Sequence, residues 1–231
     1  MFWYDSTYIL ILIGVVISAI ASVRVNSTYS KYSRVRSRSG MTGAEAAEKI
    51  LHMAGIYDVQ VTHVRGSLTD HYDPRAKVLR LSDAVYGQSS VAAIGVAAHE
   101  CGHAIQHHIG YVPLSIRSAI VPVANFGSQL SWPLFLIGLF INGNTGYALM
   151  MGGIILFSAA LLFQLITLPV EFNASSRAVR ILGETGILRE DELPYTKKVL
   201  GAAALTYVAA ALASILQILR LFILAGGRRR D

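Results

Sequence analysis

The chain has 231 residues, of which 53% are hydrophobic and 15% are charged. Soluble domains carry about 25% charged residues, so this composition excludes an ordinary soluble globule, and the apolar content excludes a disordered chain. The single cysteine, Cys101, excludes an internal disulfide and a zinc site built from several cysteines. The net charge of +6 comes mostly from basic residues that flank apolar segments. We therefore expect no nucleic-acid partner.

Four apolar segments predict three to four membrane-spanning helices. They cover residues 8–23, 118–142, 147–170 and 199–224. The first segment carries no charge and no basic residue precedes it, which favours an uncleaved anchor over a signal peptide. The turn-rich pentapeptide Asn142–Gly146 joins the second and third segments into a hairpin. Gln217 and Arg220 interrupt the fourth segment, which either spans the bilayer or lies partly in its interface.

The basic residues predict the orientation of these spans. Several lysines and arginines follow the first and third apolar segments, and one precedes the second: Arg24, Lys31, Arg34, Arg36, Arg38, Arg117, Arg177, Arg180, Arg189, Lys197 and Lys198. Because short cytoplasmic loops are enriched in such residues, residues 24–117 and 170–198 are expected in the cytoplasm. The basic tail, residues 228–230, disagrees with this orientation if the fourth segment spans completely. The sequence thus predicts a multi-pass protein of the cell membrane whose polar parts face the cytoplasm.

The larger polar segment predicts a small α+β unit. The basic, serine-rich residues 26–39 are interpreted as a solvated linker. The capping box Thr42–Glu45 predicts the start of a helix that Gly55 can end. Valines at 59–64 and the sequence KVLRLS (77–82) predict two strands. Ser89 or Ser90 caps a long helix that covers about residues 91–109.

This long helix contains the pattern H-E-x-x-H at residues 99–103. His99 and His103 are four residues apart, so both imidazoles lie on one face and can bind one metal ion. Glu100 can lean toward a water at that metal, take its proton and deliver it to a leaving amine. The residues around the motif are apolar, and buried ionisable groups need partners or a metal. Cys101 points to the other side of the helix and is expected to pack as a small residue.

A catalytic zinc ion needs a third protein ligand and an open position. Glu171 follows the third apolar segment, and two membrane crossings separate it from His103, so both residues return to the same side. The alternative interpretation of Glu171 is a carboxylate stabilised at a helix N-terminus. Pro169 is expected to mark a helix start or a kink. Other acidic candidates lie in a loop marked by Gly and Pro and are interpreted as solvated charges: Glu184, Glu190, Asp191 and Glu192.

Three motifs follow one another between the apolar segments. They are LTDHYDPRAKVLRLSDAVYG (68–87), AAHECGHAIQH (97–107) and EFNASSRA (171–178). Together, and over nearly the whole chain, they resemble the neutral zinc metallopeptidase family, the YugP-like membrane proteins of bacteria. The resemblance implies a membrane-embedded, gluzincin-like endopeptidase with Zn²⁺ as cofactor. It also implies that His99, His103 and Glu171 are the metal ligands and that Glu100 is the catalytic base.

The sequence departs from the gluzincin pattern at Ser175, where those enzymes place an aspartate that orients a zinc histidine. Ser175 or Asn173 is the candidate to replace it by hydrogen bonding. Arg177 is one candidate for stabilising the oxyanion. His71 is a candidate to approach the site, although its DHYDPR segment favours a turn with side-chain-to-backbone bonds over a second metal cluster. The KVLRLS strand is expected to offer its edge to the substrate backbone.

These expectations combine into a mainly α membrane protein with three to four transmembrane helices and a small α+β zincin-like catalytic core. Five segments are predicted: a transmembrane anchor (1–24), a zincin-like lobe with the H-E-x-x-H helix (25–117), a transmembrane hairpin (118–170), a third-ligand helix and loop (171–198), and a C-terminal apolar helix with a basic tail (199–231). The expected function is zinc-dependent hydrolysis of peptide bonds in membrane or juxtamembrane substrates. The competing hypothesis is a non-catalytic membrane scaffold with a structural zinc site.

Overall fold

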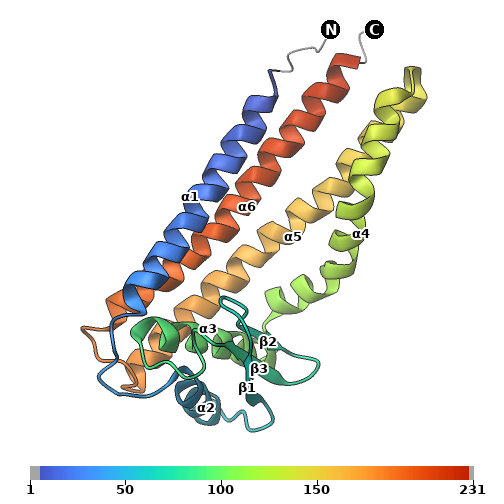
Figure 1. Ribbon diagram of the computed structural model, residues 1–231. Coiled ribbons are helices and arrows are strands. Elements are labelled where there is room, and N and C mark those ends of the chain that lie inside the picture. Colours follow the sequence, from blue (N-terminus) through green and yellow to red (C-terminus); the bar gives the residue numbers. More distant parts are fainter. Residues whose placement is uncertain (1–5, 229–231) are drawn as a thin grey trace. The chain divides into compact units, whose positions relative to one another are not determined.

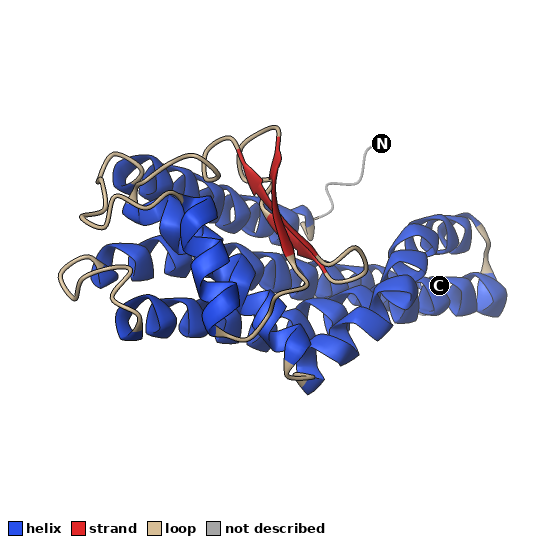
Figure 2. Cartoon of the chain, turned by 90° about the horizontal axis from the view of Figure 1, so that it is seen from below, coloured by secondary structure: helices blue, strands red, loops and turns tan. Residues whose placement is uncertain are grey.

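The computed structural model describes residues 6–228, and apart from three short strands its regular elements are helices (Figure 2). Four of the helices are long and apolar enough to cross a membrane. They are α1 (Tyr8–Tyr32), α4 (Val112–Phe140), α5 (Gly143–Glu184) and α6 (Leu193–Arg228) (Figure 1). The most apolar stretch of each reaches a mean hydropathy between 1.3 and 2.4. The predicted mainly α membrane fold is confirmed, and the fourth apolar segment is part of a helix of spanning length.

The chain divides into two compact units. Within the described residues, a helical unit consists of residues 6–21, 116–168 and 206–228. A core unit consists of residues 22–115 and 169–205. Each of the four long helices contributes residues to both units.

Small residues let the helices of the helical unit approach closely. A Cβ atom placed on Gly127 of α4 would lie 2.7 Å from the carbonyl oxygen of Leu156 in α5. Likewise, a Cβ on Gly153 of α5 would lie 2.7 Å from the carbonyl oxygen of Ser131. Such contacts are typical of helices packed in lipid, where close van der Waals contact takes over from the hydrophobic effect. Large apolar side chains such as Phe126, which is 64% exposed, remain on the outer surface.

The core unit combines two shorter helices with a small sheet (Figure 1). Besides parts of the four long helices, it contains α2 (Gly43–Met53), β1 (Gln60–Val64), β2 (His71–Asp73), β3 (Val78–Ser82) and α3 (Val91–His108). The strand order is β1-β3-β2, with β1 parallel and β2 antiparallel to β3. The KVLRLS strand therefore exists, but the expectation that its edge is open to substrate is wrong, because β3 is the central strand and both neighbours hydrogen-bond to it.

Local sequence signals explain these elements. Thr42 and Glu45 form the predicted capping box, with each side chain bonded to the backbone N–H of the other residue, and α2 starts there. Ala46, Ala47 and Ile50 of α2 are buried in the core of this unit, and so are the alternating Leu79 and Leu81 of β3. The apolar faces predicted from the periodicity thus meet around α3.

Three interpretations of the connecting segments need correction. The predicted linker 26–39 is helical up to Tyr32, because α1 continues beyond its apolar part and the Tyr32 ring stacks on Tyr195 at a centroid distance of 5.3 Å. Of the two expectations for Pro169, the helix start is wrong, because Pro169 lies inside α5. Glu192 is not solvated: it is 4% exposed, and its carboxylate accepts hydrogen bonds from the backbone N–H groups of Arg38 and Arg189, both at 2.9 Å.

Candidate metal centre

The ligand-bearing face of α3 packs directly on other helices. Ser90 caps the helix by accepting a hydrogen bond from the backbone N–H of Ala93 at 3.1 Å. Gly102 lies between the two motif histidines, and a Cβ there would lie 2.7 Å from the carbonyl oxygen of Ala174 in α5. The glycine is therefore required for the close approach of α3 and α5, and this approach brings the H-E-x-x-H motif next to residue 171.

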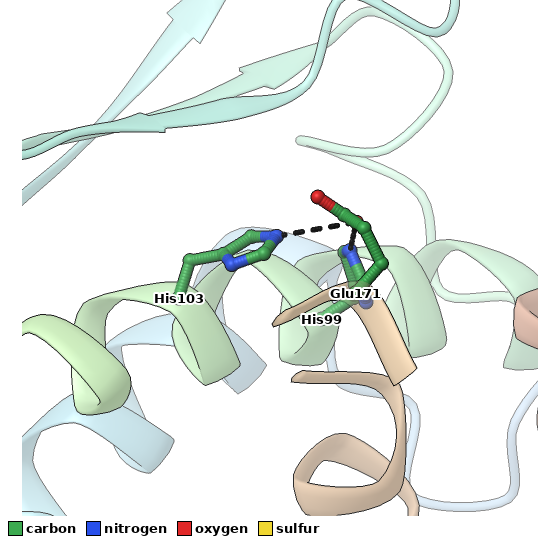
Figure 3. A group of neighbouring side chains, drawn as sticks. All are labelled: His99, His103 and Glu171. Atoms are coloured by element: carbon green, nitrogen blue, oxygen red, sulfur yellow. Dashed lines mark ion pairs between the residues drawn. The ribbon is translucent and has the colours of Figure 1, made fainter. Parts of the chain in front are cut away.

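His99, His103 and Glu171 form one cluster in the core unit (Figure 3). The two histidines project from α3 toward the carboxylate of Glu171, which comes from α5. Glu171 Oε2 lies 3.3 Å from His99 Nε2 and 3.5 Å from His103 Nε2. Three ligand atoms, one from each residue, lie within 4.8 Å of one another. The structure thus brings together the three residues that the sequence nominated from two distant segments.

The second nitrogen of each imidazole contacts a polar side chain. His99 Nδ1 lies 3.1 Å from the hydroxyl oxygen of Ser175, and His103 Nδ1 lies 3.0 Å from Gln106 Oε1. Metal-binding histidines in proteins are commonly oriented in this way through the nitrogen that does not face the metal. Both Nε2 atoms therefore face Glu171, and each Nδ1 atom contacts a polar side chain, Ser175 or Gln106.

Electrostatics couple the acidic residues to the histidines. Burial by itself lowers the pKa of His103, but the hydrogen bond to Glu171 and the charge of Glu100 outweigh burial, so the pKa of His103 is raised. Glu100 is only 8% exposed and follows His99 directly on α3. The Glu100 charge thus acts on His103, and Glu100 is not one of the three clustered ligand residues.

The donor set fits a zinc ion. One type of catalytic zinc site uses two histidines and one glutamate with ligand distances of about 2.0–2.2 Å, and two such ligands around a tetrahedral ion are about 3.3 Å apart. The separations of 3.3 and 3.5 Å between Glu171 Oε2 and the two Nε2 atoms agree with this requirement. Within residues 6–228 the cluster has three members, so a tetrahedral ion held there would keep a fourth position for water.

Comparison with known proteins agrees with this geometry. Residues 7–226 match the family described as "Putative neutral zinc metallopeptidase". The chain belongs to this family. It is also similar to a protein of Bacillus subtilis (strain 168) named "Putative membrane protease YugP", with 54% identity over 200 residues, which cover 87% of this chain and 88% of the relative. No solved structure matches the chain.

In this family member, α5 carries a second group of polar residues behind the ligands. Asn173 and Arg177 do not reach the histidines directly: Arg177 Nε donates to Asn173 Oδ1 at 2.7 Å, and Gln106 Nε2 donates to the same oxygen at 3.0 Å. Sequence reasoning missed Gln106. A usable signal was its spacing, because residues 99, 103 and 106 repeat on one face of a helix.

His71 and Cys101 lie outside the ligand cluster. His71 Nδ1 contacts the carbonyl oxygen of Thr69 at 2.8 Å, and its Nε2 lies 3.3 Å from Arg80. The predicted turn begins later than expected, because His71–Asp73 form strand β2 and the turn covers residues 74–77, where Asp73 accepts hydrogen bonds from the backbone N–H groups of Arg75 and Ala76. Asp70 accepts hydrogen bonds from the backbone N–H and the hydroxyl of Ser82. Burial raises the pKa of the Cys101 thiol, as expected for a packed residue.

A groove of about 420 Å³ lies between α5 and α6 in the core unit. Its walls are mainly apolar, with Phe172, Val179 and Leu200, and carry the basic side chains Arg180 and Lys197. Ser175 also lines the groove, so the residue that contacts His99 Nδ1 is reachable from this side.

Proposed function

We propose that this chain is a membrane-embedded zinc-dependent endopeptidase. The observation that carries the proposal is the convergence of His99, His103 and Glu171. Glu100, which directly follows His99 in α3, is also buried. Zinc held by the three ligands would supply a Lewis acid that polarises the scissile carbonyl and lowers the pKa of a water molecule to about 7. Proton transfer and the orientation of the ligands are the proposed tasks of the protein's own side chains.

Glu100 is the residue proposed to move the proton. As a carboxylate it takes one proton from the attacking water, whose oxygen bonds to the carbonyl carbon. As a carboxylic acid it then returns that proton to the amine nitrogen when the C–N bond breaks. Ser175 is proposed to orient His99, replacing the aspartate found at this position in other gluzincins. Burial of Glu100 limits competing exchange of the proton with bulk water.

Membrane or juxtamembrane peptides are the proposed substrates. Glu171 belongs to α5, a single helix of 42 residues that is also a candidate membrane span. One of the ligands is therefore attached to a helix with a long apolar part. The basic residues after α1 and after the apolar part of α5 favour placing the site on the cytoplasmic side. The bilayer and a membrane-bound polypeptide are the corresponding partners.

The variant Glu100→Gln tests the proposal in the purified full chain. The amide keeps the shape of the side chain but cannot accept and release the proton, so cleavage of casein or of a membrane-protein substrate should fall by about 10²–10⁴-fold while zinc content is unchanged. Glu48→Gln, on the exposed side of α2, is the matched control and should retain activity. Undiminished cleavage by Glu100→Gln would overturn the assignment of the base. If zinc is bound but the wild-type chain cleaves neither substrate, the non-catalytic scaffold becomes the better explanation.

A further inference from the structure

Gln106 is a fully buried amide one helical turn after His103. Burying an amide is costly unless its polar atoms are hydrogen-bonded. Here the oxygen contacts His103 Nδ1 at 3.0 Å. The nitrogen donates to the carbonyl oxygen of Val170 at 2.9 Å and to Asn173 Oδ1 at 3.0 Å. The side chain thus connects the second motif histidine to α5.

The chemistry of these partners determines the direction of every hydrogen bond in the chain of contacts. The guanidinium of Arg177 can only donate, so the Asn173 atom 2.7 Å from its Nε must be the amide oxygen. The Val170 atom is a backbone carbonyl oxygen, which can only accept. Gln106 therefore faces two acceptors with its NH₂ group and must turn its oxygen toward His103.

Gln106 Oε1 accepts, so a neutral ring that keeps this hydrogen bond carries its proton on His103 Nδ1 and its lone pair on Nε2. A metal ion can bind only that lone pair. In the absence of a metal ion, the Glu171 carboxylate competes as an acceptor at Nε2. His99 differs, because the hydroxyl of Ser175 can donate or accept and is compatible with either tautomer. The two histidines are therefore controlled differently.

We propose that Gln106, oriented by Asn173 and Arg177, is a positioning residue that holds His103 in the tautomer that binds the metal. The proposal rests on the proposed function in one respect, namely that His99, His103 and Glu171 hold zinc. Gln106 contributes preorganisation: without it the ring samples the other tautomer, which directs an N–H group at the ion, and rotated orientations, which turn the Nε2 lone pair away from the ion. Loss of such an outer partner typically lowers metal affinity about 10–100-fold.

The first test compares zinc affinities of full-chain variants by competition with a chromogenic chelator. Gln106→Met keeps the length of the side chain but removes all three hydrogen bonds, and it should weaken zinc binding about 10–100-fold. Gln106→Glu keeps an acceptor for His103 Nδ1 and should recover part of that loss. Asn173→Asp keeps an acceptor for both donors and should bind zinc within about twofold of the wild type. Gln88→Met, at an exposed position, is the control.

The second test reads the tautomer directly and needs no folded variant of Gln106. Nitrogen-15 NMR of histidine-labelled, metal-free Glu171→Ala protein, which lacks the competing carboxylate at Nε2, should show His103 protonated at Nδ1 once the ring is neutral. The signal is identified by its absence when His103→Asn is added to the same protein. Predominant protonation at Nε2 would overturn the proposal, as would wild-type zinc affinity in Gln106→Met. If the wild-type chain binds no zinc, the proposed function fails, whereas the tautomer measurement still decides the role of Gln106.

Discussion

Gly102→Ala is the substitution that most directly probes how α3 and α5 assemble the site. The added Cβ would lie 2.7 Å from the carbonyl oxygen of Ala174, 3.1 Å from its Cα and 3.2 Å from its carbonyl carbon. All three neighbours are backbone atoms, so no rotamer change can relieve the contact. Ordinary van der Waals contacts begin at 3.4 Å, and the helices must therefore separate by about 0.7 Å.

A displacement of this size matters because the ligands lie on both sides of the contact. His99 and His103 flank Gly102 on α3, and Glu171 lies one turn before Ala174 on α5. Functional sites tolerate about 0.5 Å of misplacement, and metal–ligand distances vary by only about 0.2 Å. We expect the zinc affinity to fall at least about tenfold. This is the smaller of the effects on metal affinity that are typical when a residue hydrogen-bonded to a metal ligand is lost. Overpacking should also cost about 1–3 kcal/mol of stability, partly offset by about 1 kcal/mol from the higher helix propensity of alanine.

The assay is chelator competition for zinc together with thermal unfolding of the purified chain in detergent. Gly201→Ala is the matched control, because it makes the same change inside α6 at a position where no heavy atom lies within 4 Å of the added Cβ. The control should bind zinc normally and unfold at the same or a slightly higher temperature. Wild-type zinc affinity in Gly102→Ala would show that the close contact of the two helices does not determine the ligand positions.

Three further outcomes follow from the contacts described above. Thr42→Ala removes the N-cap of α2 and should cost about 1 kcal/mol, measured as a lower midpoint of chemical unfolding. The hydrogen bond from the Gly66 N–H and the contact with His63 lower the pKa of Asp83. The ionised carboxylate therefore stabilises the folded chain at pH values above the usual pKa range of aspartate, and this stabilisation is lost as the pH falls through the lowered pKa. The Tm difference between wild type and Asp83→Asn should therefore shrink toward acidic pH, and a constant difference would contradict this. Ser175→Ala should weaken zinc binding about tenfold without unfolding the protein, and an unchanged affinity would remove it as a positioning group.

The sequence predicts those features that depend on local periodicity. The capping box, the β3 strand and the long helix that carries His99 and His103 are found where their patterns placed them. Glu171 could be nominated because an even number of membrane crossings returns the chain to the same side. These inferences need only short spacings or a count of segments, so they do not depend on knowing the packing.

Features that depend on contacts between distant segments could not be predicted in the same way. Strand order is one: β1 and β3 pair in parallel with β2 between them in sequence, so the strand next to the site helix became central. Glu192 is another, because its acidic, loop-like neighbourhood gives no sign that two backbone N–H groups from separate segments enclose it. Gln106 was overlooked because a lone glutamine in a helix is usually exposed. Its spacing places it on the face of His99 and His103, but its hydrogen bond to α5 cannot be inferred from that spacing.

Zinc K-edge absorption spectroscopy of the purified wild-type chain examines the proposed metal centre itself. We expect one zinc ion per chain with two imidazole nitrogens and oxygen ligands at about 2.0–2.2 Å, and with one of the oxygen ligands exchangeable for an added anion. Substituting Glu171 by alanine should remove one oxygen ligand or abolish binding. A zinc ion enclosed by four protein ligands with no exchangeable position, or no stoichiometric zinc at all, would be incompatible with a catalytic zinc centre.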